Sequence, residues 1–224
     1  MTFGERVVQY TLSLAGVWQL PEGFELLYPY DEPICRELFT TFYHRYYHDH
    51  HQRYLLLGIN PGRFGAGITG VPFTDPITLE LLTGAPNTLK KKPELSSQFM
   101  YHMIQAMGGL SAFCHKYYIG SVCPLGFVKG GKNCNYYDDQ NLYEAIEGHI
   151  VEAIRQQIAF GAHTELAFCI GQGKNLTFLK QLNQSYQFFD RIEPLPHPRW
   201  VMQYQKKNLN IHIDSYLQKL NQMS

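Results

Sequence analysis

The apolar residues of this chain gather in four short runs that alternate with longer helical patterns. The runs are typical of β-strands and cover residues 53–59, 117–123, 166–170 and 188–195. The helical patterns cover residues 4–15, 33–47, 95–108, 139–160, 173–184 and 201–221. Strands that alternate with helices form a mostly parallel sheet with both faces covered. The predicted fold is therefore α/β, a three-layer α/β/α sandwich around a central, mostly parallel four-stranded sheet.

The length and composition predict one domain that covers residues 1–224. The hydrophobic content of 45% suits a globular core. No stretch approaches the roughly 20 apolar residues that cross a bilayer, and the first residues lack a secretion signal. The five cysteines are dispersed and contain no Cys-x-x-Cys pair, which argues against a disulfide framework and a zinc site. We expect a monomer without metal or cofactor that is intracellular and cytoplasmic, or nucleoid-associated if bacterial, with no membrane partner.

A glycine-rich loop follows the run that ends at Ile59. Asn60 opens this loop, and Phe73 returns thirteen residues later. Ligands of open α/β sheets bind outside the carboxyl ends of the strands. The loops at 60–73, 124–135, 171–174 and 196–200 share this edge. We expect the amide of Asn60 to position a reactant there, and the ring of Phe73 to stack on a planar group.

The formal net charge is zero, but the charges are unevenly distributed. Residues 60–135 and 172–207 together carry thirteen Lys and Arg against five Asp and Glu. These segments contain the loops of the predicted site, so a positive face that binds nucleic acid is plausible. Ordinary scatter of surface lysines is the alternative, and charge alone does not separate the two.

The motifs in these loops resemble the uracil-DNA glycosylase superfamily, most closely its single-strand-selective monofunctional (SMUG-like) branch. Gly58–Phe73 fits the pattern G-x-N-P-G-x-F-G-x-x-x-T-G-V-P-F at every fixed position. The other matching segments follow in family order: Glu94-Leu-Ser96, Cys123-Pro-Leu125, Gly131-Lys-Asn133 and Leu195-Pro-His-Pro-Arg199. The resemblance covers most of the chain.

The resemblance implies a monofunctional glycosylase that hydrolyses the N-glycosidic bond of a flipped base in DNA and leaves an abasic site. Asn60 would orient the attacking water, and His197 would donate to the base carbonyl that gains negative charge. Ile59, Phe73 and Ser121 would line the base pocket. Gly62 stands where the uracil-specific branch has a bulky tyrosine, which implies tolerance for 5-substituted uracils such as 5-hydroxymethyluracil.

Each of these residues also has a purely structural interpretation. Asn60 could simply begin a turn, His197 could be a surface histidine, and Phe73 could pack in the core. Their occurrence together in family order favours function. We expect DNA contacts from Arg63, Lys129, Lys132, Lys174, Arg199 and Trp200.

The chain departs from the family pattern at two positions. The family has an asparagine where this chain has Ser121, so uracil readout weakens and xanthine or hypoxanthine becomes a candidate substrate. Asn133 or Asn135 could take over the missing contact. The Ser-Pro step after His197 is absent, which leaves Arg199, Trp200 or Met202 as the residue that wedges into DNA. Trp200 could equally anchor the last helix in the core.

These departures keep two alternatives open beside the glycosylase. One is a non-catalytic module that binds damaged or single-stranded DNA on the same fold. The other is a binder of small nucleosides or nucleotides, which is supported only by the α/β pattern and the glycine turns.

The cluster His48-Asp-His-His51 is more simply a solvated helix end than a metal site, because adjacent histidines converge poorly on one ion.

Overall fold

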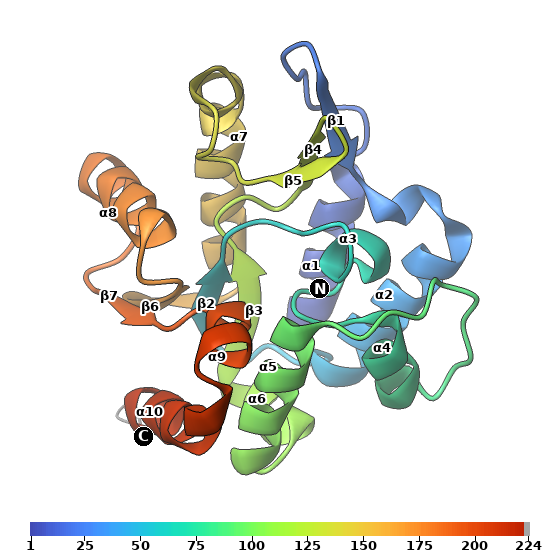
Figure 1. Ribbon diagram of the computed structural model, residues 1–224, viewed down its shortest axis with the longest axis vertical. Coiled ribbons are helices and arrows are strands. Elements are labelled where there is room, and N and C mark those ends of the chain that lie inside the picture. The colour runs from blue at the N-terminus through green and yellow to red at the C-terminus, as the bar shows by residue number, and fades with distance from the viewer. Residues whose placement is uncertain (222–224) are drawn as a thin grey trace.

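The computed structural model describes residues 1–221 (Figure 1). Its strands are β1 (Phe24–Leu27), β2 (Arg53–Gly58), β3 (Tyr117–Ser121), β4 (Gly126–Lys129), β5 (Lys132–Cys134), β6 (Ala162–Ile170) and β7 (Ile192–Leu195). Its α-helices are α1 (Phe3–Ser13), α2 (Pro33–Tyr46), α3 (Ala66–Thr69), α4 (Pro76–Thr83), α5 (Leu95–Ala106), α6 (Leu110–Lys116), α7 (Gln140–Ala159), α8 (Lys174–Tyr186), α9 (Pro198–Tyr204) and α10 (Leu209–Asn221). Two 3₁₀ turns, η1 (Pro29–Asp31) and η2 (Lys206–Asn208), complete the set.

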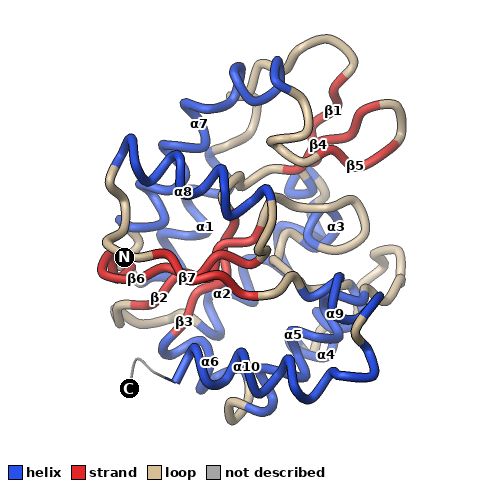
Figure 2. The backbone as a smooth tube through the Cα atoms, turned by 60° about the vertical axis from the view of Figure 1, so that its left-hand side comes forward, coloured by secondary structure: helices blue, strands red, loops and turns tan. Residues whose placement is uncertain are grey.

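The four strands predicted from the apolar runs form one sheet in the order β3-β2-β6-β7, with every neighbouring pair parallel. Residues Leu55, Leu56 and Leu57 of the central strand β2 are fully buried, as expected for a parallel strand with both faces covered. In Figure 2, α1, α7 and α8 lie on one side of this sheet, and α5, α6 and α10 lie on the other. The predicted three-layer α/β/α fold is confirmed.

The register of the sheet places all four carboxyl ends at one edge. Gly58 pairs with Ser121, and Ile170 pairs with Leu195. Beyond β3, the backbone N–H groups of Val122 and Cys123 donate to the carbonyls that end β2 and follow it, at 2.9 and 3.1 Å. The loops after the four strands therefore start close together, although they are far apart in the sequence.

The segment 124–135, expected to be a loop, contains the strand pair β4–β5, which joins β1 in a second, antiparallel sheet. Gly130 and Gly131 make the turn with φ of 56° and 72°, the left-handed conformation that a two-residue hairpin requires. A Cβ on Gly126 would overlap the carbonyl oxygen of Pro61, so β4 lies directly against the glycine-rich loop. The prediction missed this hairpin because β5 has only three residues, two of them polar.

The single helix expected over 201–221 is wrong. Three shorter elements, α9, η2 and α10, occupy this segment. The first begins at Pro198, because proline suits the first turn of a helix, and ends before Gln205, whose φ of −123° is not helical. The helix thus starts inside the motif that carries His197, where a loop was expected.

The last strand is also shorter than its apolar run. Only Ile192–Leu195 pairs with the sheet, whereas Phe188 and Phe189 are buried in the preceding loop. The amide of Asn183 holds this loop, since it both donates to and accepts from the backbone of Phe189 at 2.8 Å. The apolar run is therefore longer than the strand, because Phe188 and Phe189 are buried without pairing with the sheet.

The histidine-rich segment before β2 is a structural element. The carboxylate of Asp49 accepts from the buried guanidinium of Arg53 at 2.8 Å and from the backbone of His51 at 2.9 Å.

Among residues 1–221, no group of three or more His, Cys, Asp or Glu side chains could hold a metal ion. All five cysteines are buried and free. None of the described helices combines the length and the apolar character of a membrane-spanning segment.

Candidate active site

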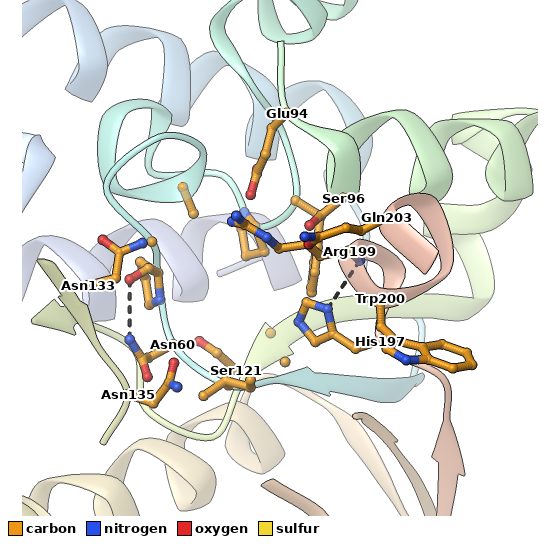
Figure 3. A pocket seen from close by; sticks show the side chains of 18 of the residues that line it. Asn60, Glu94, Ser96, Ser121, Asn133, Asn135, His197, Arg199, Trp200 and Gln203 are labelled. Atoms are coloured by element: carbon orange, nitrogen blue, oxygen red, sulfur yellow. Dashed lines mark hydrogen bonds between the residues drawn. The ribbon is translucent and has the colours of Figure 1, made fainter. Parts of the chain in front are cut away.

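A cavity of about 380 Å³ lies at the edge where the four parallel strands end (Figure 3). It brings together most of the residues predicted for the site, namely Ile59, Asn60, Gly62, Phe73, Ser121, His197, Arg199 and Trp200. The cavity also contains residues to which the sequence assigned no role: Gly58, Pro61, Ala66, Pro72, Glu94, Ser96, Gly120, Gln203 and Tyr204. We call this space the base cavity.

Asn60 stands on one wall with its side-chain amide held by backbone groups. Its Nδ2 donates to the carbonyls of Pro61 at 3.2 Å and Cys134 at 3.4 Å, and its Oδ1 accepts from the N–H of Tyr136 at 3.1 Å. Both amide hydrogens are thus engaged, and the amide cannot flip without losing all three bonds. Because an amide oxygen has two lone pairs, Oδ1 can accept one further hydrogen bond, from a water.

His197 stands on the facing wall, at the start of α9. Its Nδ1 accepts from the backbone N–H of Arg199 at 3.2 Å, so the proton of the neutral ring sits on Nε2. Burial, with a smaller contribution from the Arg199 charge, lowers the pKa of His197 to about 4. Near pH 7 the imidazole is therefore neutral, and its Nε2–H is available as a donor.

Phe73 adopts a backbone conformation that is unusual for a residue with a large side chain. Its φ is 52°, in the left-handed region. Its ring lies 6.0 Å from the ring of His197 and packs on Gly58, where a Cβ would come within 3.1 Å of the ring. Phe73 therefore lines the cavity between β2 and the His197 ring.

The wall at Gly62 is open because the residue has no side chain. A Cβ at this position would lie 3.3 Å from Nδ2 of Asn133, a tight approach. The amide of Asn133 is itself engaged, since its Oδ1 accepts from the N–H of Arg63 at 3.2 Å. Any larger residue at Gly62 would therefore narrow this side of the cavity.

Ser121 ends β3 at the floor of the cavity. Its carbonyl accepts from Nε2 of Gln157 at 3.0 Å, whereas its hydroxyl makes no hydrogen bond with any residue among 1–221. Asn133 and Asn135, the two candidates to replace the missing asparagine, both line the cavity. Both are therefore close enough to the cavity to contact a base, and the geometry does not choose between them.

Glu94 is the main residue that the sequence left without a role. Its carboxylate fills the space that a Cβ on Gly65 would need. Burial raises the pKa of Glu94, Arg199 opposes this shift, and Asp75 adds to it. Glu94 is one of only three acidic residues in the segment 60–135, and this was the signal that could have identified it.

The six residues predicted to bind DNA fall into different settings. Arg199 and Trp200 line the base cavity, and Lys174 lines a neighbouring cavity of about 350 Å³ that Trp200 also borders. Lys132 is exposed on the hairpin. Lys129 instead pairs with Asp139 at 2.8 Å, so its charge is partly neutralised.

Arg63 lies outside the base cavity. Its guanidinium donates to the carbonyl of Gly131 and stacks over Phe64, with 4.8 Å between its Cζ and the ring centroid. Arg63 therefore links the glycine-rich loop to the β4–β5 turn. Lys129 and Arg63 thus each have a partner within the protein, so fewer of the six predicted residues are free to contact DNA than the sequence suggested.

Of the three residues predicted as a wedge into DNA, Arg199 and Trp200 remain candidates. Met202 is only 5% exposed, so its assignment as a wedge is wrong. Trp200 is 44% exposed and meets His212 of α10 edge-on, with 5.8 Å between ring centroids. It is therefore a surface residue at the mouth of the cavity rather than a core anchor.

Comparison with known proteins identifies the family of the chain. The model of the uracil DNA glycosylase superfamily matches residues 44–221. Among solved structures, the chain is similar to wild-type SMUG2 from Pedobacter heparinus, with 42% sequence identity and a TM-score of 0.94. The similarity covers 100% of this chain and 98% of that one. Comparison with curated protein sequences found no match.

The fold and the family match place the chain among the DNA glycosylases, which are hydrolases of DNA repair. The chain belongs to the uracil DNA glycosylase superfamily, in its SMUG-like branch.

Proposed function

We propose that this protein is a monofunctional DNA glycosylase of base excision repair that removes uracil and related damaged bases and leaves an abasic site. The observation that carries the proposal is the placement of Asn60 and His197 on facing walls of one cavity. One side chain offers a fixed acceptor for water, and the other offers a neutral donor.

The reaction breaks the bond between the sugar carbon C1′ and the base nitrogen. The bonding electrons leave with the base, which becomes anionic, while the sugar becomes cation-like and is attacked by water. Asn60 Oδ1 accepts a hydrogen bond from this water and holds its oxygen toward C1′. The amide is not a strong base, so it acts by position. The water loses a proton to solvent as it bonds to C1′, and the departed base anion takes up a proton from solvent, so that the charges balance.

His197 acts on the leaving base. Its Nε2–H donates to the carbonyl oxygen on which the negative charge of a departing pyrimidine gathers. A single preorganised donor of this kind is worth about 3 kcal/mol, or roughly 10²-fold in rate. The lowered pKa keeps the ring neutral, so it stabilises the anion without first carrying a charge of its own.

The cavity walls support a broader substrate range than uracil alone. Gly62 puts no side chain into the cavity beside C5 of a pyrimidine, which suits 5-hydroxymethyluracil. Ser121 is shorter than the asparagine of the family pattern and leaves space for a deaminated purine, xanthine or hypoxanthine. Phe73 would stack on the flipped base, and Ile59 would flank it.

We propose that the DNA strand crosses the mouth of the base cavity beside α9. Arg199 and Trp200 stand there, with Lys174 in the neighbouring cavity. Trp200 can fill the gap left by the flipped base or stack on its neighbour. We expect a monofunctional enzyme without strand cleavage, because a Schiff base needs an amine, and the lining residues described include no lysine. We expect the enzyme to be monomeric, cytoplasmic and active without metal.

The test is a panel of labelled oligonucleotides that carry uracil, 5-hydroxymethyluracil, hypoxanthine or xanthine, each single-stranded and in duplex. Hot alkali after incubation would reveal abasic sites, and omission of alkali would reveal lyase activity. We expect alkali-dependent cleavage of at least the uracil strand. Salt-dependent binding with no product on any substrate would contradict the enzyme and support the non-catalytic binding module instead.

A further inference from the structure

Helix α9 carries two exposed aromatic side chains at the mouth of the base cavity. Trp200 is 44% exposed and Tyr204 is 66% exposed, and both line the cavity. They are four residues apart, so they lie on the same side of the helix, one turn from each other. Figure 3 shows the indole of Trp200 pointing away from Asn60. We call Trp200 and Tyr204 the aromatic pair.

Exposed aromatic rings are rare in this protein. Among residues 1–221, the exposed Phe, Tyr and Trp side chains are the aromatic pair and Tyr186, the last residue of α8. The ring of Tyr186 stacks on that of Phe188, with 5.6 Å between centroids. Tyr204 makes no hydrogen bond or ring contact with any residue of the described part of the chain. Packing of the fold therefore does not account for the ring of Tyr204, which is free to bind a planar partner.

Positive charge lies beside the aromatic pair. Lys206 and Lys207 of the turn η2 follow α9 directly, and both are exposed. Neither forms an ion pair with any residue among 1–221. Residues 196–213 contain these two lysines and Arg199 but no Asp or Glu. Aromatic rings next to unpaired cations are typical of surfaces that bind the bases and phosphates of a single strand.

We propose that the aromatic pair stacks on unpaired bases next to the target base, while Lys206 and Lys207 bind the phosphates of the same stretch of DNA. The inference rests on the proposed function, because it continues the path of the strand beyond the base cavity. It gives a role in DNA binding to Tyr204, Lys206 and Lys207.

The occupant must be unpaired, because each base of a duplex is covered on both faces by its neighbours. One aromatic ring can enter the gap that a flipped base leaves, and Trp200 is placed to do so. A second ring one turn further along α9 needs a second base that is not stacked. The surface therefore favours a single-stranded substrate, in which Trp200 and Tyr204 can both be used.

The first test measures binding to labelled single strands that contain no target base, so it does not depend on catalysis. We expect Tyr204→Leu to bind oligothymidine about tenfold more weakly than the wild type, the typical effect of one stacked base. On a strand of equal length made of abasic nucleotides, the two proteins should bind equally, because the phosphates remain and the bases do not.

The matched control is Tyr186→Leu, which removes an exposed ring about 18 Å along α8 from the start of that helix. It should bind oligothymidine like the wild type. The proposal would be overturned if Tyr204→Leu bound as tightly as the wild type, or if its loss were the same on the abasic strand.

The second test separates the lysines from the rings through the salt dependence of binding. Lys206→Gln and Lys207→Gln should each reduce the slope of log K against log salt concentration by about 0.7, as expected for one phosphate contact on a single strand. Tyr204→Leu should leave the slope unchanged. Wild-type slopes in both lysine variants would overturn the phosphate contacts.

The third test uses excision of uracil placed near the 5′ or the 3′ end of a single strand. We expect kcat/KM of the wild type to rise with the number of nucleotides on one side of uracil, and Tyr204→Leu to lose this dependence while kcat stays the same. An equal loss on a duplex would overturn the proposal, as would a wild-type rate that depends on neither side. A protein that excises no base would contradict the proposed function alone, since the binding tests still decide this inference.

Discussion

Asn60 and His197 face each other across one cavity, but the chain holds them in opposite ways. Asn60 depends on long-range contacts, because two of its three hydrogen bonds reach Cys134, which ends β5, and Tyr136, two residues further on. His197 depends on a local contact, the N–H of Arg199 two residues away. Remote changes in the hairpin should therefore disturb the water-binding wall and spare the wall that binds the leaving base.

The largest effect on stability should come from Asn60→Asp. A carboxylate cannot donate to the carbonyls of Pro61 and Cys134, so it would face two acceptors in a partly buried site. We expect Asn60→Asp to be less stable than Asn60→Ala by about 1–3 kcal/mol in urea unfolding at pH 7. Because repulsion raises the carboxyl pKa in the folded state, this difference should shrink as the pH falls. Equal stability of the two variants at pH 7 would mean that the amide hydrogens do not hold the side chain.

The next largest effect should come from Gly126→Ala, a change outside the base cavity. The new methyl group would press on the carbonyl of Pro61 and shift the start of the glycine-rich loop. We expect kcat to fall about tenfold or more, since small displacements of a positioned reactant are costly. The matched control is Gly148→Ala, because Gly148 lies in α7 with nothing within 4 Å of the added Cβ. If both variants turned over like the wild type, the hairpin would not position Asn60.

A third test concerns His197, and it measures how the stability of the protein depends on pH. The pKa of His197 is about 4 in the folded protein, against a usual value of 6.5. As the pH falls, the imidazole therefore binds a proton in the unfolded chain before it does so in the folded protein. Stability from this group is therefore complete above about pH 6.5 and is lost as the pH falls toward 4. Between pH 7 and pH 5 we expect a loss of up to about 2 kcal/mol that His197→Gln does not show. The comparison requires urea unfolding of both proteins at both values, and parallel losses would contradict the lowered pKa.

The smallest effect should come from Glu94→Gln, which removes a negative charge from the mouth of the cavity and changes neither Asn60 nor His197. We expect binding of DNA to strengthen about two- to fivefold at low salt, and the gain to shrink at high salt. Glu165→Gln is a suitable control, because Glu165 is an exposed carboxylate in the first half of β6, away from the strand ends that form the cavity. Fluorescence anisotropy with a labelled oligonucleotide measures both, and equal gains would mean that only net charge matters.

The parts of the site that could be predicted are those determined within a single segment. The apolar run before Asn60 and the glycines after it indicate a strand that ends in an open loop, whatever the rest of the chain does. Leu195–Arg199 likewise indicates a strand end, and its resemblance to a known motif assigned His197. These local patterns were sufficient for the parallel sheet and for bringing Asn60, Phe73 and His197 to the base cavity.

The parts that were missed arise from contacts between distant segments. The three residues of β5 carry no strand pattern, so nothing indicated that the return of the hairpin would fix the Asn60 amide. Gln157 sits in a helix that is otherwise ordinary, and its amide matters only because β3 packs beside it. Met202 was a candidate wedge by its position after His197, but the early start of α9 turns it into the core.

The most direct test of the central claim is the excision of uracil from a labelled single strand by Asn60→Ala under single-turnover conditions, with DNA binding measured in parallel. If Asn60 orients the attacking water, the rate falls by about 10³-fold or more while the dissociation constant changes less than about threefold. A variant that retains most of the wild-type rate, or that loses activity only because it no longer binds DNA, would contradict the account.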